Sequence, residues 1–187
     1  MGLADFANLK VNKETLYVAE DFGMKDYANE FIDIIRQDDS WSRKTEGLHY
    51  TNLDAHHTEW RMHLTHKCFK ILSERVEDYI TEKSHGIGIK LETKEVWGGI
   101  YGQGDSAAPH SHQPYIWSWC YYVKAPEGCS PIIFPRHQLD EKGKDEIIQP
   151  KDDMLVVFPG SKVHKVPKSE IKEERVMIAG NTSYCQT

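Results

Sequence analysis

The sequence of 187 residues lacks several features that would place it in a broad class at once. No apolar run approaches the roughly 20 residues that a helix needs to cross a bilayer, so we expect no membrane partner. The N-terminal sequence MGLADFANLK lacks the basic and apolar regions of a secretory signal, so we expect none. A formal net charge of −6 is opposite to the basic balance of nucleic-acid-binding proteins, and no nucleic-acid partner is expected.

Cysteine is scarce, and its spacing is uninformative for metal binding. The four cysteines form no CxxC pair, which is the spacing typical of structural zinc sites and of thiol–disulfide exchange. We interpret them as buried free thiols in a reducing compartment and expect a cytoplasmic protein.

The pattern of apolar residues changes from helical to strand-like spacing at about residue 87. Apolar residues at steps of three and four predict helices over 24–37 and 58–83, with Thr58 as N-cap of the second. From residue 87 onward, short segments rich in β-branched and aromatic residues recur about every ten residues, which is typical of a barrel or sandwich. We expect a single domain, with 1–86 as a helical extension and support and 87–187 as the β-core.

Three histidines and one arginine carry the chemistry that the pattern suggests. His110 and His112 stand two apart in the segment PHSHQP, and side chains two apart on an extended segment project to the same side. His164 follows the apolar segment MLVVFP and a short turn, which places it at the end of a sheet. Arg175 comes eleven residues later, on a following strand, where its guanidinium can bind a carboxylate bidentately. The set predicts a metal site with an arginine for an anionic cosubstrate.

Neither the metal nor the role of the arginine is fixed by this pattern. Imidazole suits iron, zinc, copper and nickel about equally. Arg175 could instead form a surface ion pair with Glu173 or Glu174. The aromatic segment YIWSWCYYV divides into two strand faces, and either set reads most simply as core. These faces are Trp117, Trp119, Tyr121 and Val123 on one side and Ser118, Cys120 and Tyr122 on the other.

The order of the motifs resembles the Fe(II)/2-oxoglutarate-dependent oxygenases. The stretch HSHQPYIWSWCYYV is similar to an H-x-H-x(8)-Y-Y-V pattern of a bacterial and phage group in that superfamily. A second stretch runs from P-x-D-D-x-L-V-V-F-P-G through a lone histidine to E-R-V-x-I-A-G-N. The resemblance therefore covers about residues 87–183 and, more loosely, the segment WSRKTEGLHYTNLD at 41–54. It implies a mainly β protein, a cupin-like double-stranded β-helix (jelly roll) buttressed by two N-terminal α-helices. The location it implies is a bacterial cell or a phage-infected host.

The resemblance also implies roles for individual residues. His110 falls on the proximal metal histidine of the family and His164 on the distal one. Arg175 takes the place of the arginine that binds the far carboxylate of 2-oxoglutarate, and Tyr121 stands where some relatives use a tyrosine on the same group. The implied cofactor is Fe(II), and the implied reaction uses O2 to oxidise 2-oxoglutarate to succinate and CO2 while a prime substrate is hydroxylated.

One position departs from the superfamily. The usual second element is H-x-D or H-x-E, and here that slot is His112. A neutral imidazole leaves the metal with more net positive charge than a carboxylate does. Three outcomes stay open: His112 is the third ligand, which we favour; an acid such as Asp105 supplies a carboxylate; or the site holds another metal.

Two other functions compete with the oxygenase. A cupin dioxygenase or isomerase with a three-histidine metal fits Gly104, six residues before His110, but lacks the expected later glutamate and has no particular use for Arg175. A non-catalytic jelly-roll module, structural or sugar-binding, is the alternative from another class. The sequence does not indicate the prime substrate or the oligomeric state.

Overall fold

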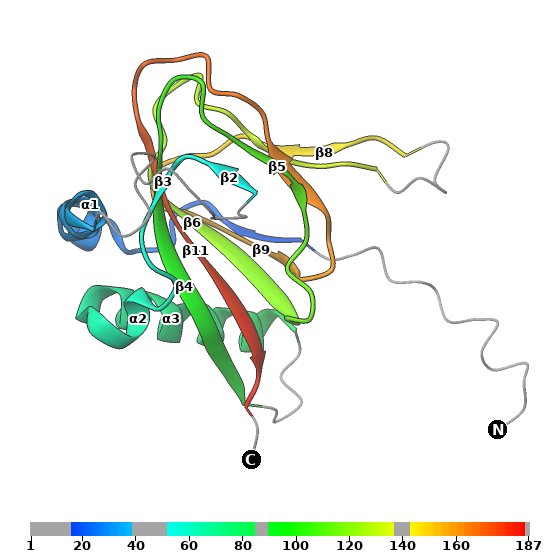
Figure 1. The fold of residues 1–187 in the computed structure, drawn as a ribbon. Helices are drawn as coiled ribbons and strands as arrows, with labels where there is room; N and C mark the ends of the chain where they lie inside the picture. The colour runs from blue at the N-terminus through cyan, green and yellow to red at the C-terminus, as the bar shows by residue number, and fades with distance from the viewer. Residues whose placement is uncertain (1–15, 39–51, 85–89, 137–142, 186–187) are drawn as a thin grey trace, which may run out of the picture.

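Two antiparallel β-sheets face one another, and helices lie on the outer face of the larger sheet (Figure 1). The structure is a computed structural model and describes residues 16–38, 52–84, 90–136 and 143–185. The prediction of a mainly β protein supported by helices is confirmed within these residues. Most of the segment 41–54, part of the resemblance, lies outside them.

The larger sheet has the strand order β1-β9-β6-β11-β4-β3, and the smaller has the order β2-β5-β10-β7-β8. The strands of the larger sheet are β1 Tyr17–Ala19, β9 Met154–Pro159, β6 Trp117–Lys124, β11 Arg175–Tyr184, β4 Leu91–Tyr101 and β3 His56–His57. Those of the smaller sheet are β2 Leu53–Asp54, β5 Ser106–His110, β10 His164–Val166, β7 Ile132–Phe134 and β8 Glu146–Ile148. Three strands from the first part of the chain, β1, β2 and β3, therefore pair with strands of the β-core.

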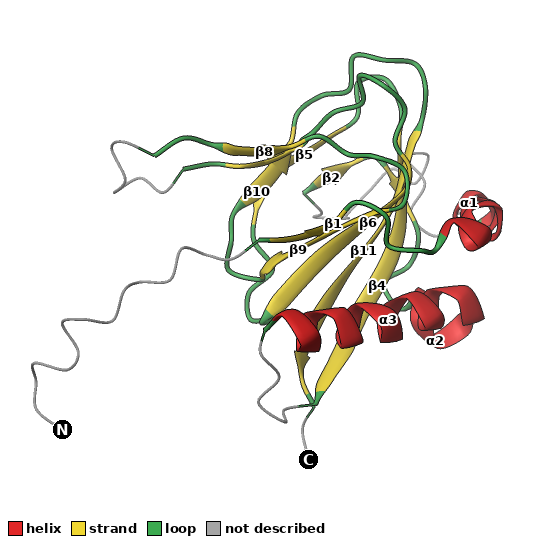
Figure 2. Cartoon of the chain, turned by 180° about the vertical axis from the view of Figure 1, so that it is seen from behind, coloured by secondary structure: helices red, strands yellow, loops and turns green. Residues whose placement is uncertain are grey.

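Helices cover the outer face of the larger sheet, and α3 runs across its strands (Figure 2). The elements are the 3-10 helix η2 Lys25–Tyr27, α1 Ala28–Gln37, α2 Met62–Thr65 and α3 Lys67–Lys83. They bury an apolar stripe at helical spacing, made of Phe31 and Ile35 on α1 and of Cys68, Phe69, Leu72, Val76 and Ile80 on α3. Burial of this stripe against the sheet stabilises the helices. In the described ranges, no helix combines the length and apolar character that a membrane crossing requires.

The second predicted helix begins later than the sequence indicated. Residues 58–61 are not helical, and α2 starts at Met62. His66, with extended backbone angles of φ −124° and ψ 124°, separates α2 from α3. The prediction that Thr58 caps a helix is wrong, because its hydroxyl accepts a hydrogen bond from the Gly98 backbone N–H at 3.0 Å. A side chain that looks like a helix cap in the sequence therefore attaches this segment to β4.

The central strands of the larger sheet are buried on both faces. On β6, Tyr121 packs in the core shared with the helices, while Tyr122 packs in the core between the two sheets. On β11, Ile178 belongs to the helix side and Met177 to the inter-sheet side. Successive side chains of a strand point to opposite faces, so one residue of register decides which core each side chain joins.

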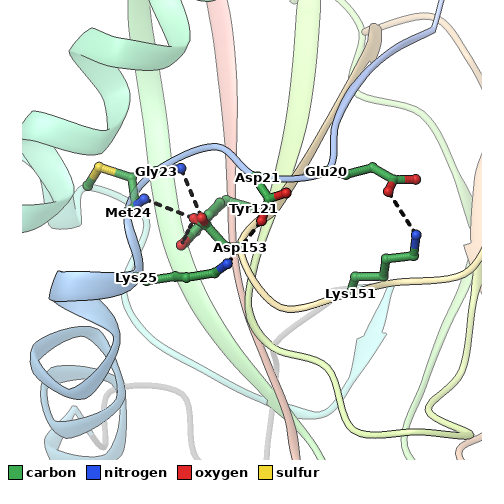
Figure 3. Close-up of polar contacts among 8 residues, drawn as sticks. All are labelled: Glu20, Asp21, Gly23, Met24, Lys25, Tyr121, Lys151 and Asp153. Atoms are coloured by element: carbon green, nitrogen blue, oxygen red, sulfur yellow. Dashed lines mark hydrogen bonds and ion pairs between the residues drawn. The ribbon is translucent and has the colours of Figure 1, made fainter.

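Asp153 fastens the N-terminal segment to the larger sheet (Figure 3). Its carboxylate accepts hydrogen bonds from the backbone N–H groups of Gly23 and Met24, both at 2.9 Å, and from the Tyr121 hydroxyl at 2.8 Å. Asp153 is 2% exposed and has φ 62°, a left-handed conformation that aspartate adopts more readily than most residues. Three donors offset the cost of burying the carboxylate, and they hold the chain that leads into α1.

Gly98 marks the closest approach of α1 to β4, because a methyl group at this position would overlap the Ile35 side chain. We expect Gly98→Ala to lower the free energy of unfolding by about 1–3 kcal/mol, since overpacking forces the helix or the side chain to move. Chemical denaturation measures the change. Gly102→Ala is the matched control, since the nearest atom to its added methyl lies 3.9 Å away, and it should change stability by less than about 1 kcal/mol. Equal losses in the two variants would contradict this role for Gly98.

Candidate metal centre and its pocket

Two of the predicted histidines lie opposite one another in the smaller sheet. His110 ends β5 and His164 begins β10, and the two residues are direct partners in the antiparallel pairing of these strands. Their ring centroids are 4.3 Å apart. Facing positions of an antiparallel pair bring side chains into contact, so residues 54 positions apart in the chain meet through strand pairing.

His112 joins this pair from the loop that follows β5. Its backbone N–H donates to the Gly160 carbonyl at 2.7 Å, which holds the loop against the end of β9. A side chain at position 160 would overlap the backbone of Tyr115, so the close approach requires glycine. The centroid of the His112 ring lies 4.9 Å from that of His110 and 5.0 Å from that of His164. The three imidazoles therefore converge, as the sequence predicted.

The hydrogen bonds of two of the rings fix which nitrogen is free. Nδ1 of His110 donates to the Ala108 carbonyl at 2.7 Å, and Nδ1 of His164 donates to the Lys162 carbonyl at 3.2 Å. A carbonyl only accepts, so Nε2 of each neutral ring carries the lone pair. This arrangement, with one nitrogen held by a backbone oxygen and the other free, is the one that metal-binding histidines adopt.

The ring nitrogens of the three histidines lie close enough together to share a metal ion. The Nε2 atoms of His112 and His164 are 3.3 Å apart, and one potential ligand atom from each of the three histidines lies within 4.8 Å of the others. Two nitrogens bound at about 2.1 Å to one ion lie about 3.0–3.4 Å apart for angles between octahedral and tetrahedral. Among the described residues, this is the one group of three or more potential ligands that comes together, and no carboxylate belongs to it.

Burial keeps the imidazoles neutral and ready to bind a cation. Desolvation lowers the pKa of His164 to about 3 and that of His112 to about 4, with a smaller contribution from the neighbouring rings. Desolvation also lowers the pKa of His110, against a hydrogen bond to Ala108 that raises it. At neutral pH the rings are unprotonated, so binding of a metal displaces no proton from them.

Arg175 enters the same pocket from the first position of β11. It is 3% exposed, and its guanidinium lies over the ring of Tyr101 at 4.2 Å and near that of Tyr122 at 5.8 Å. Nη1 donates to the Ser130 carbonyl at 2.5 Å, while Nε is buried and has no hydrogen-bond partner within the part of the chain that the structure describes. The alternative of a surface ion pair is wrong, because Glu174 pairs instead with Arg36 at 2.7 Å. A buried guanidinium without a carboxylate partner among the described residues has the chemistry to bind an anion.

A pocket between the sheets, partly open to solvent, contains the metal-binding candidates. Besides the three histidines and Arg175, its lining is mostly apolar and aromatic: Leu53, Trp97, Tyr101, Ala107, Trp119, Cys120, Tyr122, Ile132, Phe158, Val166, Met177 and Ala179. A mostly apolar lining with a few convergent polar groups is typical of small-molecule sites.

Tyr121 does not reach the pocket, and its assignment to the cosubstrate is corrected. Its side chain points into the helix-side core, where it packs beside Phe31 and bonds to Asp153. Tyr122, one position later, faces the pocket instead, together with Tyr101 from β4. Sequence reasoning missed both residues. Strand parity placed the two neighbouring tyrosines of β6 on opposite faces but did not indicate which face lines the pocket.

Asp105 does not supply a metal ligand. Its carboxylate accepts a hydrogen bond from the Gly102 backbone N–H at 2.8 Å, within the turn that joins β4 to β5. It is buried at 4% exposure but belongs neither to the histidine group nor to the pocket lining. Among the alternatives for the third position, the geometry favours His112.

Comparison with known families identifies the β-core. Residues 95–181 match the sequence model of a family described as "Putative 2OG-Fe(II) oxygenase". This segment belongs to that family. The match contains His110, His112, His164 and Arg175. The family model, the oxygenases that share the fold and the histidine group indicate a 2OG-Fe(II) oxygenase that uses Fe(II), 2-oxoglutarate and O2. No curated protein sequence matches it.

Solved structures of other oxygenases share the fold. A viral collagen prolyl hydroxylase from Paramecium Bursaria Chlorella virus-1 is 17% identical with a TM-score of 0.67, over 97% of this chain and 98% of that one. A Pseudomonas putida prolyl-4-hydroxylase is 15% identical with a TM-score of 0.68, over 93% and 95% of the two chains. A Trichoplax adhaerens prolyl hydroxylase, in complex with a hypoxia inducible factor peptide fragment, is 15% identical with a TM-score of 0.67, over 92% and 84%. The jelly-roll prediction is confirmed, and identities this low establish the fold alone.

Tyr121→Phe separates a structural role from a cosubstrate role for this residue. The variant removes one of three donors to the buried Asp153 carboxylate, so we expect the free energy of unfolding to fall by about 1–3 kcal/mol. The affinity for 2-oxoglutarate, measured by calorimetry on the metal-loaded protein, should stay unchanged, because Tyr121 lies outside the pocket lining. A weaker affinity for 2-oxoglutarate at unchanged stability would restore the original assignment.

Proposed function

We propose that His110, His112 and His164 hold the Fe(II) of this oxygenase and that Arg175 binds the far carboxylate of 2-oxoglutarate. The observation that carries the proposal is the convergence of three neutral imidazoles and one buried guanidinium in a single pocket. When bound, Fe(II) would supply O2 activation, with oxidation of 2-oxoglutarate to succinate and CO2 and hydroxylation of a prime substrate.

The residues around Arg175 prepare it to bind a carboxylate. Ser130 holds one end of the guanidinium through its carbonyl, and the Tyr101 ring supports its face. A guanidinium fixed in this way loses little conformational entropy when an anion binds. Burial leaves the Nε–H without an acceptor, and a carboxylate oxygen would provide one. The apolar lining lowers the local dielectric and strengthens the ion pair.

The same arrangement weighs against the two competing functions. A cupin-type metal site has no particular use for a buried arginine, whereas a keto-acid dianion does. A purely structural jelly roll has no use for three converging imidazoles, two of which bond through Nδ1 to backbone carbonyls and so carry the lone pair on Nε2. The oxygenase assignment accounts for both features.

Three further proposals concern the domain organisation, the compartment and the partners of the chain. We propose one domain, since β1, β2 and β3 complete the two sheets. A cytoplasmic location is supported by the four free cysteines, three of which are buried. Neither a membrane nor a nucleic acid is proposed as a partner, in keeping with the net charge of −6, and the oligomeric state is left open.

Turnover of 2-oxoglutarate is the direct test. Purified protein with Fe(II), ascorbate, O2 and 2-oxoglutarate should form succinate, if only slowly while the prime substrate is missing. His164→Ala should abolish succinate formation and reduce bound metal below one ion per chain, because one of three ligands is lost. Lack of succinate from a protein that binds both Fe(II) and 2-oxoglutarate would contradict the proposed reaction.

Arg175→Met should weaken 2-oxoglutarate binding far more than metal binding. Loss of a charged hydrogen-bonded pair costs about 2–4 kcal/mol, which corresponds to about 30-fold to 1,000-fold in the dissociation constant. Arg36→Met is the matched control, because Arg36 pairs with Glu174 at the surface, and it should leave both affinities unchanged. Equal loss of metal and 2-oxoglutarate in Arg175→Met would indicate a structural role for the arginine and contradict the proposal.

A further inference from the structure

The pocket contains one charged side chain among the described residues that line it. That residue is Arg175, and the lining includes no aspartate or glutamate. Burial raises the pKa of Cys120 to about 11 and that of Tyr101 to about 12, so both stay neutral at physiological pH. Burial also raises the pKa of Tyr122. Before any ligand enters, the pocket therefore offers positive charge alone.

A bound metal ion increases the excess of positive charge in the pocket, and no described residue of the lining carries a negative charge that would offset it. A divalent cation held by three neutral imidazoles, together with the guanidinium, gives three positive charges in an apolar enclosure. A 2-oxoglutarate dianion neutralises two of them. In a site with two histidines and one carboxylate, the carboxylate neutralises the third. Here His112 occupies that position, and an uncompensated buried charge is costly.

The end of the pocket away from Arg175 offers a position where an anion could neutralise the remaining positive charge. The register of β4 and β11 pairs Tyr101 with Arg175 at one end and Trp97 with Ala179 at the other. The His112 ring lies at the Trp97 end, 5.9 Å from the Trp97 ring. Trp97 is 4% exposed, and its indole Nε1 has no hydrogen-bond acceptor among the described residues. A donor without an acceptor therefore stands beside the histidine that replaces the carboxylate.

We propose that this oxygenase binds a monoanion beside His112 and Trp97, as a third component together with the metal and 2-oxoglutarate. The inference rests on the proposed function of the site and adds a ligand to it. The anion restores charge balance and accepts a hydrogen bond from the Trp97 indole. Two sources share this chemistry: the carboxylate of an anionic prime substrate, and a small inorganic anion.

Azide binding to the Co(II)-loaded protein tests the proposal without turnover. In chloride-free buffer saturated with 2-oxoglutarate, azide should change the visible absorption of Co(II) and saturate at one azide per metal. His112→Asp places the missing charge within the chain, so its affinity for azide should be at least about tenfold weaker, while Co(II) still binds. No azide response from a wild-type protein that binds Co(II) and 2-oxoglutarate would overturn this inference and leave the proposed function intact.

A second variant tests the same site without altering its charge. Trp97→Phe removes the indole N–H and keeps an aromatic ring, so azide should bind several-fold more weakly while the affinity for 2-oxoglutarate is unchanged. Unchanged azide affinity in both Trp97→Phe and His112→Asp would overturn the proposed location. Failure of the wild-type protein to bind Co(II) or 2-oxoglutarate would overturn the proposed function and this inference together.

The two sources are separated by competition against azide. If the native anion is the carboxylate of a prime substrate, affinity should rise from formate through acetate and butyrate to benzoate, because the Phe158 ring lies 6.4 Å from the His112 ring and the pocket lining is mostly apolar. If it is a small inorganic anion, chloride should compete at least as well as any carboxylate. Either order supports an anion site, and no competition by any of these anions would contradict one.

Discussion

Pairing of β5 with β10 is the interaction on which the site depends. It sets His110 directly opposite His164, and it brings the loop that carries His112 against the end of β9. Backbone carbonyls then orient two of the rings. Because strand pairing fixes positions to within a fraction of an ångström, three ligands that are distant in sequence are held ready before a metal arrives. A shift of one residue in this register would turn His164 away from its partners.

The larger sheet provides the other half of the site. Its outer face is covered by α1 and α3, and its inner face carries Arg175 and the tyrosines on which the guanidinium rests. Glycine allows the close contact between α1 and β4, and Asp153 fastens the N-terminal segment to the start of β9. Helices far from the chemistry therefore stabilise the rigid wall that positions the arginine, while the smaller sheet positions the histidines.

Residue type and spacing in the sequence were sufficient to locate the histidines and Arg175. The pair at i and i+2, a lone histidine after a buried strand and an arginine on the next strand reflect local geometry that strands impose. Tyr121 shows where this reasoning failed: two adjacent tyrosines on β6 face opposite cores, and only the pairing with β9 and β11 decides which one lines the pocket. The contact between Thr58 and Gly98 was equally hidden, because it is a tertiary contact with β4.

The central claim is that three imidazoles bind one ion in this protein and that no side-chain carboxylate does. X-ray absorption at the iron edge, on anaerobic protein loaded with Fe(II) and 2-oxoglutarate, counts the imidazole ligands most directly. The account predicts scattering from three imidazoles per iron, and from two after His112→Asp. Two imidazoles per iron in the wild-type protein would contradict it, because one of His110, His112 and His164 would then lie outside the coordination shell.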